Sequence, residues 1–389
     1  MKTLAALALL SAVLAGCSTT GGPVSSGGLP PDLGKPAEKG PESAPLTERE
    51  IRAMVSKLIP ASVKDRTGWA NDLQTSFTYL GFPHAPQVYC AAIAVIEQES
   101  SFQADPVVPG LPDIVWRELE QRGKKYGIPK LLISAALIKS SPDGRSYNQR
   151  IAALKTEKQL NTLFADMIAE LPAGKQLFAG YNPVRTGGPM QVSIEFAEQF
   201  SRDKPYPYSL SGTTIRNEVF TRRGGLYFGS AILLDYPAPY DDVVYRFADF
   251  NAGRYSSRNA AFQSALAKLS RKTLALDGDL LRYQGGKAIE QPSSVETALR
   301  NLSPQLRLNA GEIRRDLLLE KSADFGLSPL FARLFALADK SAGQPVPRQA
   351  MPQIDLKSPK ITRKLTTEWF ARRVEGRYRT CLTRGEGSN

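Results

Sequence analysis

Hydrophobic residues recur along most of this chain at intervals of three and four positions, the spacing that places them on one face of an α-helix. Alternating, strand-like patterns are few. Pro86, Pro112 and Pro129 stand where a first helical turn tolerates proline, and Ser293 with Glu296 forms a capping-box pattern. The sequence therefore predicts a mainly α fold, with helices at about 47–58, 69–80, 86–101, 112–126, 129–139, 147–170, 193–201, 224–235, 241–250, 258–273, 293–301, 311–323, 328–341 and 360–381.

The N-terminus has the pattern of a secretory signal, with one basic residue and then an apolar run too short to span a bilayer. Its end, Leu14-Ala15-Gly16-Cys17, resembles the bacterial lipobox, which predicts a lipoprotein signal peptide at 1–16 and lipidation of Cys17. The alternative is an ordinary signal peptide followed by a chance cysteine. Ser18, where aspartate would retain a lipoprotein in the inner membrane, favours an outer-membrane lipoprotein that faces the periplasm of a Gram-negative bacterium.

Residues 17–46 are rich in Gly, Pro, Ser and Thr and predict a flexible tether. The whole sequence has a formal net charge of +12, and residues 360–384 hold eight basic and two acidic residues. Because a secreted, anchored protein rarely meets nucleic acid, anionic lipid or an acidic wall polymer is the expected partner of this basic segment. A solvated helix face is the plainer alternative.

Two cysteines remain after Cys17, and an oxidising compartment favours a disulfide between Cys90 and Cys381. His84 is the only histidine, so the sequence offers no zinc cluster and no Ser/His or Cys/His pair. We expect no metal and no cofactor. Catalysis, if any, must use carboxylates, hydroxyls and backbone amides.

Two glutamates, Glu97 and Glu99, lie close together in the apolar segment AVIEQESSFQADP. On a helix at 86–101, Glu99 is centred on an apolar stripe and Glu97 points roughly the opposite way. A carboxyl in an apolar setting has a raised pKa, which keeps it available as an acid near neutral pH. The alternative is that Glu99 only caps a helix or pairs within the core. The stripe consists of Val88, Ala92, Val95, Ile96 and Phe102.

Three motifs follow one another in a recognisable order: Glu99-Ser100-Ser101-Phe102, then Gly188-Pro189-Met190-Gln191-Val192, then Phe247-Ala248-Asp249-Phe250-Asn251-Ala252-Gly253. Together they resemble the Glu-Ser-x-Phe, Gly-Leu-Met-Gln and Tyr-Asn-Ala-Gly motifs of lytic transglycosylases and goose-type lysozymes. The segment from Gly224 to Leu234 resembles the glycine-led helix of that superfamily. The whole chain, with its RKLTTEWFARRVEGRYRTCL ending, also resembles a group of uncharacterised bacterial lipoproteins.

The resemblance implies a lysozyme-like core at 47–271, with 272–389 as a C-terminal helical extension. The sequence differs from the motifs of that superfamily in three ways. Pro189 replaces the usual leucine, Phe250 replaces the usual tyrosine, and 89 positions separate Glu99 from Gly188. Residues 106–185 must then form an inserted helical subdomain, which either shapes the cleft or blocks it.

By resemblance, Glu99 would be the catalytic residue of a peptidoglycan lytic transglycosylase, acting as acid and then as base while a 1,6-anhydro ring closes. The resemblance places the substrate, a peptidoglycan glycan strand, against Ser100, Met190, Gln191, Phe250 and Asn251.

Asp105 and Asp249 are the reserve carboxylates, although Asp249 is also compatible with a solvated face. Either one, at about 6.5–9.5 Å from Glu99, would make the enzyme an inverting muramidase. The other class of function that the sequence allows is a non-catalytic, lysozyme-like wall-binding or scaffold lipoprotein.

Overall fold

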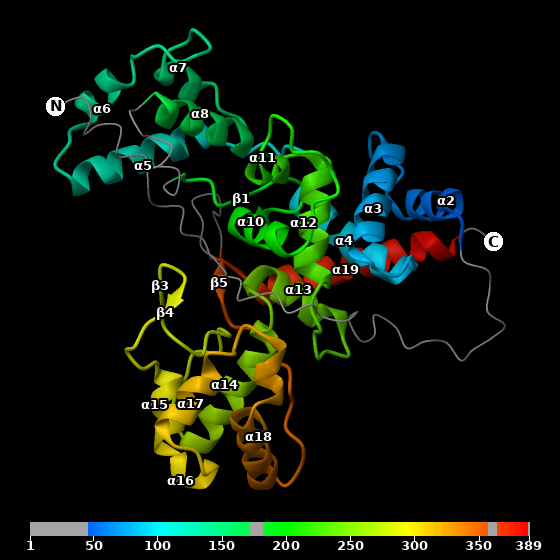
Figure 1. Cartoon of the computed structure of the whole chain (residues 1–389), viewed down its shortest axis with the longest axis vertical. Helices are drawn as coiled ribbons and strands as arrows, with labels where there is room; N and C mark the ends of the chain where they lie inside the picture. Colours follow the sequence, from blue (N-terminus) through cyan, green and yellow to red (C-terminus); the bar gives the residue numbers. More distant parts are fainter. Residues whose placement is uncertain (1–45, 171–181, 357–363, 388–389) are drawn as a thin grey trace.

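A computed structural model describes residues 46–170, 182–356 and 364–387 (Figure 1). The predicted signal peptide, Cys17 and all but the last residue of the predicted tether lie outside these residues.

The described chain is mainly helical, as predicted. Its α-helices are α2 (Glu48–Leu58), α3 (Arg66–Leu80), α4 (Pro86–Glu99), α5 (Leu111–Lys125), α6 (Lys130–Ala136), α7 (Tyr147–Ala152), α8 (Glu157–Ala169), α10 (Ile194–Asp203), α11 (Ile215–Val219), α12 (Arg222–Leu234), α13 (Val243–Ala252), α14 (Ser256–Ser270), α15 (Ser294–Asn301), α16 (Ser303–Leu306), α17 (Ala310–Leu317), α18 (Pro329–Ala342) and α19 (Thr367–Glu386). A 3-10 helix, η3, spans Ala323–Leu327.

Strands occur in the described chain only as short antiparallel pairs. They are β1 (Thr186–Gly187) with β2 (Val192–Ser193), β3 (Tyr283–Gln284) with β4 (Lys287–Ala288), and β5 (Asp355–Leu356) with β6 (Leu365–Thr366).

One predicted helix, 147–170, is two helices in the structure. Its first part ends at Ala152, and Thr156 begins a new helix with a capping box. The Thr156 hydroxyl accepts a hydrogen bond from the Gln159 backbone, and the Gln159 side chain accepts one from the Thr156 backbone. A cap of this kind satisfies orphan amides at a helix start, so it favours a break where hydrophobic spacing alone shows continuity.

Two large hydrophobic clusters divide the molecule. The first contains buried residues of α2–α8, α10–α13 and α19, and the second contains those of α14–α18 and η3. The second cluster therefore begins within the predicted 47–271 domain, and α19 returns to the first cluster. The hydrophobic clusters therefore do not divide at residues 271/272, because α14 packs on α18 and α19 packs on α4 and α13.

The predicted insertion, 106–185, contains α5, α6, α7 and α8, which form a lobe at one end of the molecule (Figure 1). Leu111, Leu160 and Phe164 belong to the first hydrophobic cluster. The lobe therefore shares its apolar core with the rest of that body.

The basic segment at the end of the chain is largely used internally. Arg377 and Arg384 pair with Glu97 of α4, and Arg379 pairs with Glu375 on α19 itself. These contacts use part of the charge of the segment within the protein, and an anionic partner of the segment stays a prediction. No described helix is both long and apolar enough to cross a membrane.

Candidate functional site

Glu99 is the last residue of α4, and the turn after it has an unusual backbone. Ser101 and Phe102 have φ values of 49° and 61°, a conformation that costs a residue with a Cβ roughly 1–2 kcal/mol. Phe102 is buried edge-on against Trp69, with 5.1 Å between the ring centroids. This packing fixes the turn and, with it, the end of α4. Strained backbone of this kind concentrates at functional sites.

Of the two glutamates of α4, Glu97 has the ion-paired role that its place on the helix allowed, and the role of Glu99 stays a prediction. Glu97 is held by the last helix, because its Oε1 lies 2.8 Å from Arg377 Nη1 and its Oε2 lies 3.4 Å from Arg384 Nη2. Glu99 is half-buried at the end of a helix that is buried without interruption from Val88 to Ile96. Glu97 is therefore a structural ion-pair residue, and Glu99 remains the candidate acid.

The Gly188-Pro189-Met190-Gln191 segment is the turn of the β1–β2 hairpin. Gly188 has a φ of 72°, Gln191 has a φ of 49°, and the Gln191 backbone N–H donates to the Gly188 carbonyl at 3.1 Å. A Cβ on Gly188 would overlap the Val219 carbonyl, so this position requires glycine. The hairpin is thus pressed against the residues that precede α12.

Glycines of α12 allow the turn to pack directly on that helix. A Cβ on Gly225 would lie 2.7 Å from Pro189 Cγ, and a Cβ on Gly229 would lie 2.7 Å from Met190 Cβ. Both distances are shorter than atoms can approach without displacement. The glycine-led helix that the sequence singled out is therefore the surface on which the second motif rests.

We expect Gly229→Ala to destabilise the fold by about 1–3 kcal/mol, because the added methyl group overpacks the contact with Met190. Gly376→Ala on α19 is the matched control, since its Cβ would meet no atom within 4 Å. There the same substitution should stabilise the fold by about 0.5–1 kcal/mol through helix propensity. Urea unfolding of both variants checks the prediction. A Gly229→Ala protein as stable as Gly376→Ala would contradict the packing.

Gln191 connects this turn to the inserted lobe. Its Nε2 donates to Glu157 Oε2 at 3.0 Å, and its Oε1 accepts from Thr186 Oγ1 at 3.4 Å. Glu157 is the first residue of α8 and was not among the predicted site residues. In the sequence, Glu157 is part of an ordinary capping box at a helix start. Only the structure shows that it lies beside the second motif.

Asn251 and Phe250 lie near the end of α13. The Asn251 Oδ1 accepts a hydrogen bond of 2.8 Å from Thr367 Oγ1, at the start of α19. Phe250 is half-buried and packs against the first hydrophobic cluster. The partner that an inward-facing amide requires is therefore provided by α19.

Ser100 and Met190, two predicted substrate-binding residues, have buried side chains. The Ser100 hydroxyl donates to the Ile96 carbonyl at 3.0 Å, and Met190 is fully buried against α12. Both side chains serve packing and helix capping. Any contact of Met190 with a saccharide would have to come from its backbone, as the resemblance implies.

Asp249 is fully buried, and its assignment to a solvated face was wrong. Its Oδ2 accepts from Tyr240 Oη at 2.6 Å, Tyr236 Oη at 3.2 Å and the Tyr255 backbone at 2.8 Å, and its Oδ1 accepts from the Ser257 backbone at 2.7 Å. Burial raises the pKa of Asp249 to about 6, although these hydrogen bonds act in the opposite direction. With its oxygens occupied, Asp249 is a structural group that joins α13 to α14.

The raised pKa of Asp249 predicts a pH-dependent stability. The folded chain holds this proton up to about pH 6 and the unfolded chain only to 3.8, so the free energy of unfolding should fall as pH rises between these values. The difference corresponds to about 3 kcal/mol. Chemical unfolding of wild type and Asp249→Asn from pH 4 to pH 7 should show a stability difference that changes across the pH 4–6 interval only. Parallel pH profiles of the two proteins would refute it.

Asp105, the other reserve carboxylate, lies at the inserted lobe. It accepts a hydrogen bond of 2.9 Å from Thr156 Oγ1, and burial raises its pKa. It lines a polar pocket of about 360 Å³ whose other charged residues are Arg145, Arg150 and Lys158. Asp105 thus remains a candidate, but its direct partners belong to the lobe.

The segments that carry the three motifs are held together by two helices. Helix α12 contacts α4, β2 and α13, and α19 contacts both α4 and α13 (Figure 1). The disulfide between Cys90 and Cys381, with 5.6 Å between the Cα atoms, joins α4 to α19 and is the pairing that the sequence favoured. Elements far apart in the chain are therefore held together by α12 and α19. Among the described residues, no group of His, Cys, Asp and Glu has the arrangement of a metal site.

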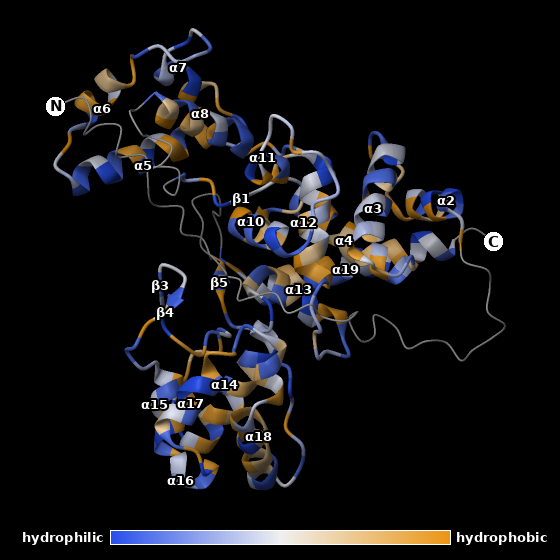
Figure 2. Ribbon diagram, viewed as in Figure 1, coloured by the Kyte–Doolittle hydropathy of each residue, from blue (hydrophilic) through white to orange (hydrophobic). Residues whose placement is uncertain are grey.

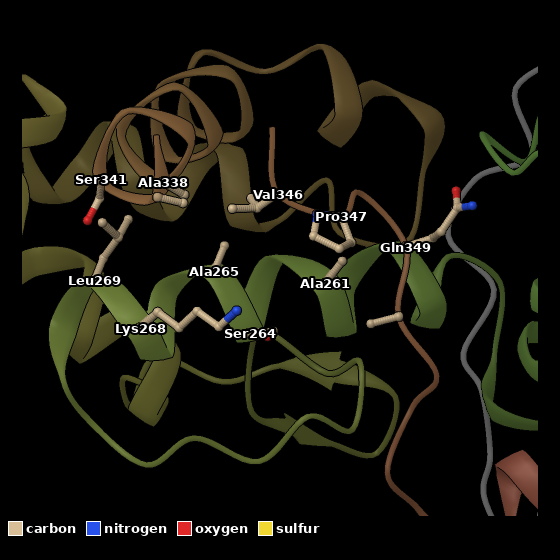
Figure 3. A pocket seen from close by; sticks show the side chains of 12 residues that line it. Ala261, Ser264, Ala265, Lys268, Leu269, Ala338, Ser341, Val346, Pro347 and Gln349 are labelled. Atoms are coloured by element: carbon tan, nitrogen blue, oxygen red, sulfur yellow. The ribbon is translucent and has the colours of Figure 1, made fainter. Parts of the chain in front are cut away.

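A separate pocket of about 340 Å³ lies in the second hydrophobic cluster (Figure 3). Ala261, Ala265 and Lys268 of α14 form one wall, and Ala338 and the segment around Pro347 form the other. The pocket shares no lining residue with the three motifs.

The chain belongs to the family described as "Protein of unknown function (DUF1615)", whose model matches residues 62–384. A relative from Escherichia coli (strain K12), "Uncharacterized protein YaiW", is 46% identical over 382 residues, which cover 98% of this chain and 98% of the relative. No solved structure matches the chain. Neither description names an activity, so the functional argument depends on the site.

Proposed function

We propose that this chain is an outer-membrane-anchored lytic transglycosylase with a lysozyme-like core, which cleaves peptidoglycan between N-acetylmuramic acid and N-acetylglucosamine. The observation that carries the proposal is the common packing of the three motifs. Glu99 ends α4, the Pro189-Met190 turn rests on α12, and α13 with Asn251 contacts the same helix.

The chemistry requires one carboxyl group. Glu99 donates a proton to the glycosidic oxygen as the bond from that oxygen to the muramoyl C1 breaks. The Glu99 carboxylate then accepts the proton of the muramoyl C6 hydroxyl while O6 bonds to C1, which closes the 1,6-anhydro ring. Because the nucleophile belongs to the substrate, the second carboxylate of ordinary glycosidases is not needed. Glu97 and Asp249 have structural roles, which is consistent with a mechanism that needs only one catalytic carboxyl group.

A second candidate function is a non-catalytic wall-binding lipoprotein with the same fold. The observation that favours it is the internal use of both amides expected at the sugar. Gln191 Nε2 donates to Glu157, and Asn251 Oδ1 accepts from Thr367. To bind a saccharide, either amide would have to replace these internal hydrogen bonds by hydrogen bonds to the sugar.

Digestion of purified sacculi separates the candidates. A transglycosylase releases 1,6-anhydromuropeptides, a muramidase that uses Asp105 releases reducing ends, and a scaffold binds sacculi without releasing products.

A further inference from the structure

Exposed hydrophobic side chains are concentrated at one end of the inserted lobe. Of the ten large hydrophobic residues that are exposed in the described chain, four lie in and around α6. They are Tyr126, Leu131, Leu132 and Ile138, with exposed fractions of 67, 78, 57 and 67%. Such residues scattered singly need no explanation, but a group on one surface indicates a contact. We call these four residues, together with Lys124, Lys125, Lys130 and Lys139, the α6 tip.

The α6 tip is strongly basic as well as apolar. No acidic residue occurs between Glu120 and Asp143, and the exposed lysines of that stretch are Lys124, Lys125, Lys130 and Lys139. Within the described part of the chain, Lys124 and Lys125 form no ion pair. The other two lysines pair with acids outside the tip, Lys130 with Glu120 at 2.6 Å and Lys139 with Glu170. Both lysines are more than half exposed, and ion pairs at a protein surface contribute little stability, so these ammonium groups are accessible to another anion.

The placement of α6 favours a surface partner over a groove-bound one. Helix α6 occupies the outer end of the lobe, away from α4 and α12 (Figure 1). Figure 2 shows hydrophobic residues along α6 and hydrophilic ones on the adjoining end of α5. Apolar side chains surrounded by lysines are the pattern of peripheral membrane segments, because the apolar groups enter the acyl boundary while the ammonium groups meet lipid phosphates.

We propose that the α6 tip is a docking surface for an anionic lipid bilayer. The four apolar side chains enter the interface, and the four lysines bind the phosphate groups of the lipids. The α6 tip binds lipid through the folded part of the protein, whereas the predicted acylation attaches lipid at Cys17. It therefore orients the folded part against a membrane and is independent of the proposed activity at Glu99.

The test uses the chain from Ser18, which lacks the predicted leader and Cys17 but keeps every described residue. Its sedimentation with vesicles of phosphatidylcholine, with and without phosphatidylglycerol, is compared with that of Leu131→Glu. Leu327→Glu is the matched control, because Leu327 is 84% exposed in η3 and lies in the other hydrophobic body. Lys124→Gln/Lys125→Gln tests the contribution of charge.

We expect binding to the anionic vesicles that weakens at high salt, with Leu327→Glu unchanged. Leu131→Glu should bind at least about tenfold more weakly, and the double lysine variant should lose affinity for anionic vesicles selectively. Equal binding by Leu131→Glu and Leu327→Glu would overturn the proposal. So would self-association that Leu131→Glu abolishes in a protein that does not bind vesicles, since the α6 tip would then be an interface between copies.

Discussion

Glu99→Gln is expected to abolish the release of 1,6-anhydromuropeptides from purified sacculi. The amide has nearly the same shape as the carboxyl, but it cannot donate a proton to the glycosidic oxygen or accept one from the C6 hydroxyl. Loss of a general acid and base typically lowers a rate by about 10²–10⁴-fold. Chromatography and mass spectrometry of the soluble products, after digestion with equal amounts of wild type and variant, measure the effect.

Glu97→Gln is the matched control, because it makes the same change two positions away on the same helix. Its partners, Arg377 and Arg384, would lose a charged acceptor, so this variant should be less stable but should still release anhydro products below its unfolding temperature. Equal product release by wild type and Glu99→Gln would exclude Glu99 as the acid. Wild-type binding to sacculi without any product would support the scaffold function.

Local sequence patterns predicted most of the longer helices, because the interval between hydrophobic residues is enough to identify the buried face of an amphipathic helix. Helix breaks and short helices depend on capping and packing, which the spacing of hydrophobic residues does not show. The Thr156 capping box divides the segment 147–170, and short elements such as α11 and α16 have too few residues for a periodic pattern. The return of α19 to the first core was indicated only by Cys381.

The structural role of Glu97 could also be predicted, since helix geometry places Glu97 and Glu99 on different faces. The actual partners could not. Glu157 reaches Gln191 from a helix of the insertion, and Thr367 reaches Asn251 from the far end of the chain. Contacts between segments so distant depend on tertiary packing, of which a single sequence carries no direct record. Asp249 was misplaced for the same reason, because its buried face is covered by tyrosines of the neighbouring loop.

Helix α19 links the stability of the fold to the position of Glu99. It packs on α4 and α13, holds Glu97 through two arginines, hydrogen-bonds Asn251 through Thr367 and is bonded to α4 through Cys381. Every one of these contacts joins the end of the chain to a segment that carries a motif. The proposed site should therefore be lost when α19 detaches.

Replacement of the disulfide by Cys90→Ala/Cys381→Ala should therefore lower the free energy of unfolding by about 2–5 kcal/mol. The bridge spans 291 positions, so its loss frees a long loop in the unfolded chain. Guanidinium unfolding measures the change. Dithiothreitol should shift the wild-type midpoint toward that of the variant and leave the variant itself unmoved. If oxidised wild type and the variant unfold at the same denaturant concentration, α19 is held by its packing and ion pairs alone, and anhydro-product release should then also survive reduction.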